Sequence, residues 1–263
     1  SPAIPNPQSP IPNPQSPITN PMTAPIALQL EHSGCTSTAV SPRVLEIAAM
    51  FGLGVDRDRR IDIVPRLTVR LGGGAVVLIT GASGGGKTTL LRLMRAALAD
   101  RPDATVIDFD TLDTLDAADR DDAGDRALVD AFEGALADAV RWLSLAGLND
   151  AFVMLRTRRQ LSDGQRYRFK LARAMAAAEA AGGGDGRLTV VLADEFGATL
   201  DRLTAAVIAR NVRQWTGRAD HVAFVAASSH DDLLEPLDPD TLIVQHPGGR
   251  AEVFARDDRS KAN

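Results

Sequence analysis

The spacing of apolar residues after Ser41 changes several times along the chain. Residues 61–64 and 67–71 alternate apolar and polar side chains, which predicts an antiparallel sheet. Residues 87–98 and 126–155 carry apolar side chains at helical spacing, and residues 43–51 fit a short strand or a helix. Apolar runs of strand length occur at 75–80, 104–109, 188–193 and 222–228. The pattern therefore predicts an α/β fold in which an antiparallel sheet precedes a strand-rich core.

The first residues of the chain have a different composition. Ile4–Pro10 recurs directly as Ile11–Pro17. Proline at this density fixes φ, removes backbone donors and leaves little apolar surface to offset chain entropy. We therefore expect residues 1–38 to form a disordered, proline-rich tail and residues 39–263 to form the folded domain. An inert linker or a misassigned start is favoured over a proline-motif ligand.

Composition narrows the class of protein. The chain has 263 residues, of which 44% are hydrophobic, enough for one sizeable core. A net charge of -5 argues against a nucleic-acid surface, and no apolar run is long enough to span a bilayer. The single cysteine, Cys35, excludes an internal disulfide framework, and no export signal is evident. We therefore expect a cytoplasmic protein.

Residues 81–88 fit the phosphate-binding pattern G-x-x-x-x-G-K-[ST] and lie between a strand-like run and a helix-like segment. Glycines allow successive backbone N–H groups to turn inward around phosphate oxygens, and the helix N-terminus adds further donors. Lys87 is expected to reach the β- and γ-phosphates and the Thr88 hydroxyl to bind Mg²⁺. The residues expected to hold nucleotide here are Gly81, Ala82, Ser83, Gly84, Gly85, Gly86, Lys87, Thr88 and Thr89. The alternative is a glycine-rich turn that happens to precede a helix.

Segments later in the chain resemble motifs that accompany such a loop in one family of ATPases. Leu161–Gln165 and the helix-like run after it resemble the LSGGQ signature of ATP-binding-cassette (ABC) ATPases, including the Q-x-x-R-x-x-x-A-R-A context. The apolar run ending in Asp194 and Glu195 resembles the Walker B strand of that family. Thr199–Asp201 lies where the family has its D-loop, and His230 where it has its switch histidine. The resemblance covers about residues 43–256, with a helical subdomain at approximately 112–180 and a terminal strand pair after Asp240.

The resemblance implies a P-loop NTPase with a RecA-like core and a set of roles. Asp194 is expected to hold Mg²⁺, Glu195 to act as general base, and His230 to contact the γ-phosphate region. As an alternative, the two acids are exposed residues at the end of a strand. Phe51 lies near the position of the adenine-stacking aromatic, and a core role for it is equally compatible with the sequence. Two cassettes of the family pack head to tail around ATP, so Ser162, Gly164 and Gln165 are expected to cover nucleotide on a second chain. The partner is then another copy or a different ABC ATPase.

Several residues depart from the family pattern. No glutamine lies between Lys87 and Gln160, so the Q-loop residue that couples cassettes to membrane subunits has no obvious counterpart. Asp163 replaces a glycine of the signature and adds negative charge, for which Arg166 is positioned to compensate. Phe196 replaces the usual proline after the catalytic glutamate.

These departures favour a soluble, non-transporter ATPase. The sequences around Leu161 and Ala193 are also similar to those of stand-alone cassettes, which in some relatives are fused to acetyltransferase-like domains. The alternative is the energy-coupling subunit of a membrane transporter, with the membrane part or an effector on another chain. A DNA-repair cassette is disfavoured by the lack of a long coiled coil, zinc-type cysteine pairs and a basic stripe. A cassette that only binds ATP is disfavoured by Glu195 and His230. The acidic residues at 110–125 fit a solvated loop better than a metal cluster.

Overall fold

The structure, a computed structural model, describes residues 24–36, 40–52, 54, 59–109, 111–112, 126–182 and 186–256. The proline repeat at residues 4–17, Asp110 and the acidic segment 113–125 lie outside these residues. Within the described part, no helix is both long and apolar enough to cross a bilayer.

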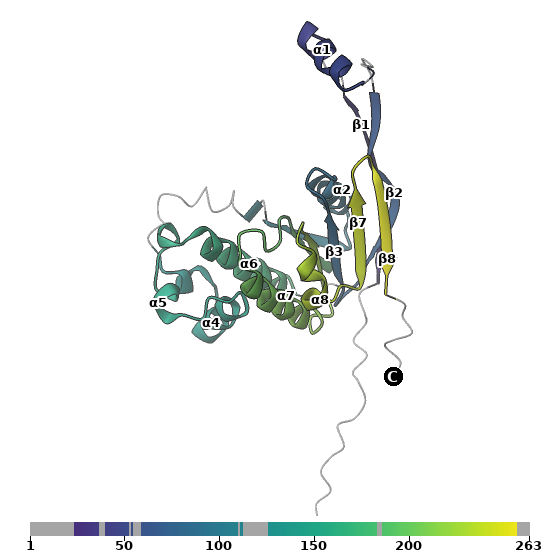
Figure 1. Cartoon of the computed structure of the whole chain (residues 1–263). Coiled ribbons are helices and arrows are strands. Elements are labelled where there is room, and N and C mark those ends of the chain that lie inside the picture. Colours follow the sequence, from purple (N-terminus) through teal and green to yellow (C-terminus); the bar gives the residue numbers. More distant parts are fainter. Residues whose placement is uncertain are drawn as a thin grey trace, which may run out of the picture.

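A six-stranded sheet forms the centre of the molecule (Figure 1). In spatial order its strands are β4 (Ala104–Asp108), β5 (Leu188–Ala193), β6 (Val222–Ala227), β3 (Val76–Gly81), β7 (Thr241–His246) and β8 (Arg250–Ala255). Neighbouring strands from β4 to β7 are parallel, and β7 and β8 are antiparallel. The predicted α/β fold is therefore confirmed, and the terminal strand pair forms as expected.

Helices cover both faces of this sheet, which explains why its central strands are mostly apolar. Every residue of β5 and β6 is buried. On one face, α6 (Asp163–Ala180) and α7 (Arg202–Thr216) share a core with Val191 and Phe224. On the other face, α2 (Lys87–Ala99) shares a second core with Ile79 and Val225. Each fully buried aliphatic side chain in these cores contributes about 1.5–3 kcal/mol of transfer free energy.

The antiparallel sheet before the phosphate loop differs from the prediction in one strand. Residues 61–64 and 67–71 belong to one long strand, β2 (Arg59–Leu71), whose partner is β1 (Ile26–Thr36). The prediction of a disordered tail through residue 38 was therefore wrong for β1. Ile26, Leu28 and Leu30 alternate with exposed residues and are buried in the second core, so this stretch has apolar surface that the preceding repeat lacks.

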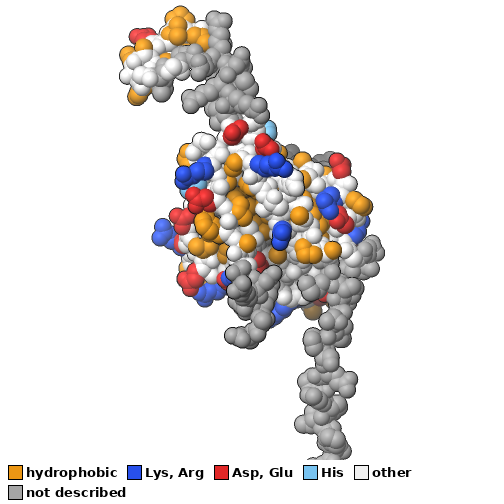
Figure 2. Space-filling model, turned by 90° about the vertical axis from the view of Figure 1, so that its right-hand side faces the viewer, with side chains coloured by type: hydrophobic (Ala, Val, Ile, Leu, Met, Phe, Trp, Pro, Cys, Tyr) orange, Lys and Arg blue, Asp and Glu red, His pale blue; other side chains and the backbone are white. Residues whose placement is uncertain are grey.

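Between β1 and β2 the chain forms α1 (Pro42–Met50), which resolves the choice between strand and helix for this segment. Ser41 caps the helix, since its side chain accepts a hydrogen bond from the backbone N–H of Val44 at 3.3 Å. The helix projects from the end of the β1–β2 pair and exposes large apolar side chains (Figures 1 and 2).

The helical region between β4 and β5 is more broken than its apolar spacing predicts. The segment predicted as helical at 126–155 contains a 3-10 turn, η2 (Leu128–Ala131), and two helices, α4 (Leu136–Leu145) and α5 (Ala151–Met154). Gly134 and Gly147 separate them, with φ of 92° and 80°, which other residues rarely adopt. The remaining short elements are η3 (Arg158–Gln160), η5 (Asp231–Leu233) and α8 (Leu234–Leu237).

Candidate functional site

The carboxyl ends of β3, β5 and β6 meet at one edge of the sheet, because these strands are parallel neighbours. A hollow of about 440 Å³ lies at this edge. Its lining residues are Ile63, Ser83, Gly84, Gly86, Lys87, Thr88, Thr89, Asp194, Glu195, Ala227, Ser228 and Ser229. Segments more than a hundred residues apart in sequence thus contribute to one site, at the end of a parallel sheet where ligands bind in α/β proteins.

The phosphate-binding loop leaves β3 and turns directly into α2. Gly84 and Gly86 have φ of 75° and 95°, and the Leu90 N–H donates to Gly86 O at 2.9 Å, which starts the helix. At Gly81 a Cβ atom would lie 2.0 Å from Gln245 O, so no other residue fits there. The loop is therefore built on glycines that both conformation and packing require, and it presents the α2 N-terminus to the hollow.

Lys87, the first residue of α2, folds back over the loop. Its Nζ donates to Gly81 O at 2.7 Å and to Ala82 O at 3.0 Å. An ammonium group has three donors, so one remains for a ligand in the hollow. The two backbone contacts fix where this positive charge lies before any phosphate binds.

The two acids that follow β5 both line the hollow. Asp194 is half-buried and its Oδ1 accepts from the Glu195 N–H at 2.9 Å. Glu195 is exposed and has a φ of 49°, a left-handed conformation that costs a residue with a Cβ about 1–3 kcal/mol. Strain of this kind persists only where the surrounding structure enforces it, and it gathers at functional sites.

Phe196 provides that enforcement. Its ring is buried against Tyr167 and Phe224, with ring centroids 6.3 and 5.6 Å away. Its N–H donates to Ala227 O at 2.8 Å and its carbonyl accepts from Ser228 Oγ at 2.9 Å. The residue that replaces the family's proline thus ties the turn after β5 to β6 and holds Glu195 in its strained position.

Tyr167 supports the same turn from α6. Its hydroxyl accepts a hydrogen bond from the Gly197 N–H at 3.1 Å. Burial raises the pKa of Tyr167 above its usual range, so the hydroxyl stays neutral at physiological pH. The turn that carries Glu195 is therefore held on both sides by buried groups.

The segment after β6 is attached to the same edge. Buried Ser228 accepts from the His230 N–H at 3.2 Å, and Thr80 Oγ1 donates to Asp231 Oδ1 at 3.3 Å. Ser228 and Ser229 line the hollow, whereas half-buried His230 follows just beyond them. His230 itself is not among the residues that line the hollow, and its contact with a γ-phosphate stays a prediction.

The signature segment lies at the N-terminus of α6. Ser162 Oγ accepts from the Gln165 N–H at 3.3 Å, and Gln165 Oε1 accepts from the Ser162 N–H at 3.1 Å, which makes a capping box. Ser162 and Asp163 are exposed, and Arg166 Nη1 donates to Asp163 Oδ1 at 3.1 Å. None of these residues lines the hollow of their own chain, whose lining comes from the loop and strand ends. The Asp163–Arg166 pair matches the expected charge compensation.

Gly164 joins the signature to the D-loop. A Cβ at this position would come within 3.3 Å of Thr199 O and 3.4 Å of a Leu200 methyl group. Asp201 caps α7, and the hydrogen bond from Thr204 lowers the pKa of Asp201 below its usual range. The two exposed loops therefore pack on each other and form one surface.

Phe51 does not fit its expected role. It is 72% exposed at the end of α1 and does not line the hollow. In Figure 1, α1 extends from the far end of the β1–β2 pair, away from α2. The residue that packs on the loop is Ile63 of β2, since a Cβ at Gly86 would lie 3.1 Å from Ile63 O. Ile63 lines the hollow, and its aliphatic side chain gives no signal in the sequence that distinguishes it from a core residue.

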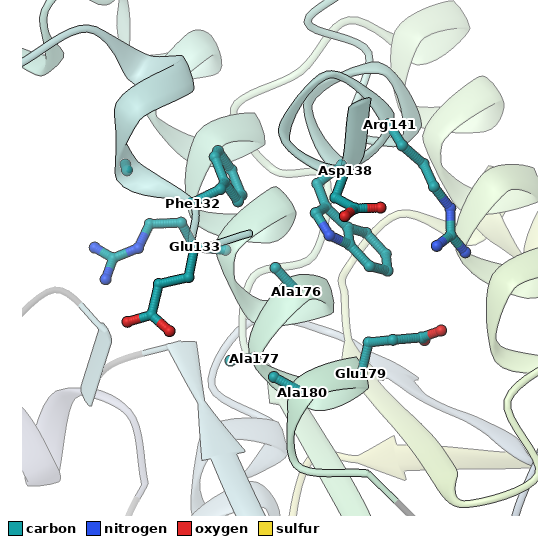
Figure 3. Close-up of a pocket in the computed structure, with 11 residues that line it drawn as sticks. Phe132, Glu133, Asp138, Arg141, Ala176, Ala177, Glu179 and Ala180 are labelled. Carbon is teal, nitrogen blue, oxygen red and sulfur yellow. The ribbon is translucent and has the colours of Figure 1, made fainter. Parts of the chain in front are cut away.

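A second hollow, of about 490 Å³, lies in the helical region between η2, α4 and α6. Ala176, Ala177 and Ala180 of α6 lie between Glu133 and Glu179 there (Figure 3). No predicted site residue lines it. Its size alone does not make it the functional site.

The edge of the sheet fits a nucleotide with Mg²⁺. Thr88 and Asp194 supply oxygen atoms to the same hollow, and oxygen is the ligand atom that Mg²⁺ takes. The described residues contain no group of three His, Cys, Asp or Glu side chains suited to a metal by themselves.

Comparisons with known proteins agree with this geometry. Residues 64–180 match the family model described as ABC transporter. A comparison with curated proteins gave no match. The solved ADP conformation of MJ1267, an ATP-binding cassette of an ABC transporter, has a TM-score of 0.52 and 14% identity to this chain, and covers 76% of it and 88% of MJ1267. The dimeric post-hydrolysis structure of the cassette MJ0796, with ADP and Pi, has a TM-score of 0.51 and 18% identity, and covers 86% of this chain and 98% of MJ0796. At these identities the likeness establishes the fold.

Proposed function

We propose that this chain, whose residues 64–180 match the family model described as ABC transporter, is an ATP-binding-cassette ATPase that binds ATP with Mg²⁺ and hydrolyses ATP between two paired chains. The observation that carries the proposal is the shared hollow of Lys87, Thr88, Asp194 and Glu195. A glycine-rich turn without function would not need two acids from a distant strand at its opening. Nor would it need a strained Glu195 held by buried neighbours.

In the proposed reaction, Lys87 and the N–H groups of the loop hold the β- and γ-phosphates. Thr88 and Asp194 would hold Mg²⁺, which would supply positive charge beside the phosphates. Glu195 accepts a proton as a water oxygen bonds to the γ-phosphorus, the bond to the bridging oxygen breaks, and ADP leaves with that electron pair. The products are ADP and inorganic phosphate. The pre-set Lys87 and the fixed turn at Glu195 favour this path, because phosphoryl transfer depends mainly on positioning and charge stabilisation.

The signature segment supports the proposal of two chains. Ser162 is exposed on the surface that Gly164 shares with the D-loop, and it lies outside the hollow of its own chain. A second chain, arranged head to tail, would present its Ser162 and Gly164 to the nucleotide on the first. MJ0796, whose fold is similar, is described in a dimeric state with ADP and Pi. The partner is a second copy or another cassette ATPase.

We propose a soluble, cytoplasmic role outside membrane transport. The feature that supports this role is the absence of a glutamine between Lys87 and Gln160, where transporter cassettes carry the residue that senses a membrane partner. The stand-alone cassettes that this chain resembles around Leu161 and Ala193 support the same role.

The second candidate is the energy-coupling subunit of a membrane transporter. It is favoured by the description of the matching family and of MJ1267 as belonging to ABC transporters. Co-purification of the native protein with a chain that has several long apolar spans would favour this candidate over the first.

The test of the ATPase proposal is the release of phosphate as a function of protein concentration, for wild type and Glu195→Gln. We expect the wild-type rate to rise faster than linearly, because active sites form only when chains pair. Loss of the general base should lower the rate about 10²–10⁴-fold, while ATP binding is kept and paired chains accumulate. A linear rate that the substitution leaves unchanged would remove both the pairing and the general base.

A further inference from the structure

Gln245 is a buried amide without a partner, directly below the phosphate-binding loop. It is 1% exposed, and neither its Nε2 nor its Oε1 has a hydrogen-bond partner among the described residues. A buried polar group left unpaired is costly, and such groups are rare in folded proteins. A methionine of similar size would avoid that cost, so the amide at this position needs an explanation.

The backbone of Gln245 is part of the loop's support. Gln245 pairs with Gly81 across the β3–β7 ladder. Cβ atoms at Gly81 and Gly85 would lie 2.0 and 3.3 Å from Gln245 O. The two ends of the loop's glycine-rich turn therefore rest on this one residue.

The side chain of Gln245 lies on the same sheet face as α2 and β2. Side chains alternate along a strand, so Gln245 shares a face with Ile243, which belongs to the core formed with α2, β1 and β2. Its strand neighbours on that face are Gly81, which has no side chain, and Ala251. Neither of these neighbours therefore places a large side chain beside the amide.

Lys87 occupies the backbone acceptors nearest in sequence to the pairing partner of Gln245. The carbonyl groups at the start of the loop, Gly81 O and Ala82 O, are held by Lys87 Nζ at 2.7 and 3.0 Å. A phosphate bound to the third donor of Lys87 would draw the ammonium group toward itself and weaken its two bonds to these carbonyl oxygens. A donor on the adjacent strand is then needed to keep the loop in its phosphate-binding form.

We propose that Gln245 is a positioning residue whose amide hydrogen-bonds the Gly81–Gly85 backbone when nucleotide is bound and is unpaired when it is not. This inference rests on the proposed binding of ATP. Because the amide gains partners only in the bound form, it adds to the affinity for ATP and lowers the stability of the free protein. These two effects have opposite signs, and an ordinary structural residue does not produce both.

The test compares the full-length wild type with Gln245→Met, and with Ile243→Leu as a control on the same face of β7. In nucleotide-free protein we expect Gln245→Met to raise the melting temperature by about 2–4 °C. In a calorimetric titration with ATP and Mg²⁺ we expect its Kd to rise about tenfold, the effect of one lost buried hydrogen bond. KM should rise with Kd and kcat should change less, whereas Ile243→Leu should leave the Kd unchanged.

An unchanged Kd in Gln245→Met would overturn the proposal. If the melting temperature also fell, Gln245 would have a static role, such as holding an enclosed water. If Gln245→Met does not fold, the side-chain amide resonance of wild-type Gln245 decides the matter. It should shift and gain protection from exchange on addition of ATP, and no change at saturation would refute the idea. Failure of the wild type to bind ATP would instead refute the proposed function, and the melting comparison would still stand.

Discussion

The candidate site has two parts, which differ in how they are held and in what they face. The loop-and-strand part comprises the phosphate-binding loop and the acids after β5, and the signature part comprises residues 161–165. Lys87, Asp194 and Glu195 lie at the ends of buried parallel strands and line one hollow. Ser162 and Asp163 lie at the exposed start of α6, where a capping box fixes the backbone. The first part comes together within one chain, whereas none of the residues that line its hollow belongs to the signature segment.

This difference bears on mechanism. We expect a part that is held by the core to bind nucleotide in a single chain, since its glycines, its lysine and its acids are already in place. A part that is ordered but exposed suits contact with another molecule, because rigid polar groups lose little entropy on binding. The comparison therefore predicts that binding and hydrolysis depend on different numbers of chains.

The largest effect is expected from removing β1, whose buried residues share a core with α2 and β3, the elements on either side of the phosphate-binding loop. Deletion of residues 1–38 removes the buried side chains of Ile26, Leu28 and Leu30. At about 1.5–3 kcal/mol each, their loss approaches the whole stability of a domain. Circular dichroism should show loss of cooperative melting. Deletion of residues 1–23 removes nothing that the structure describes and is the matched control, whose melting and hydrolysis should stay near those of the full chain.

Next is the Lys87→Ala substitution, which removes the charge fixed over the loop by Gly81 O and Ala82 O. Binding of ATP and hydrolysis should fall by about 10²-fold or more, as happens when a preorganised donor to developing charge is lost. Lys170→Ala is the control, because Lys170 lies over the Phe109 ring at 5.5 Å, away from the loop. Calorimetric binding that survives in Lys87→Ala would contradict the assignment of the loop.

A mixing experiment separates the two parts of the site directly. Ser162→Arg should block hydrolysis while leaving ATP binding to one chain intact. Mixed in equal amounts with Lys87→Ala, it should restore roughly a quarter of wild-type activity, since half of the pairs are mixed and each has one intact site. Two inactive proteins that stay inactive together would exclude a site shared between copies.

The smallest effect is expected at Asp163, whose carboxylate faces solvent beside Arg166 at 3.1 Å. Asp163→Gly should raise the hydrolysis rate at low protein concentration about two- to fivefold, since it removes one exposed negative charge near the nucleotide of the partner. Raising the salt concentration should shrink the difference, because exposed charges are screened. A lower rate in Asp163→Gly would mean that the ion pair with Arg166 is needed for pairing.

Local sequence was sufficient for the loop-and-strand part, because its residues follow apolar runs that leave few choices of structure. It was insufficient for β1, since the partner of Ile26–Thr36 begins at Arg59 and only the pairing reveals the strand. Tertiary packing also decides that Ile63 contacts the phosphate-binding loop at Gly86 and that Phe51 is exposed, away from the hollow. The strain at Glu195 follows from buried groups on β6 and α6, which no local pattern encodes.

One further consequence concerns the hydroxyl of Ser162. As a helix cap it uses a lone pair to accept from the Gln165 N–H at 3.3 Å, and its own proton remains free to donate. Capping and phosphate contact therefore make no competing demands on this atom. Threonine retains both abilities, whereas aspartate would cap the helix equally well yet offer a neighbouring phosphate only repulsion. Helix capping alone would allow serine, threonine or aspartate at position 162, whereas contact with a phosphate would allow only the two residues with a hydroxyl group.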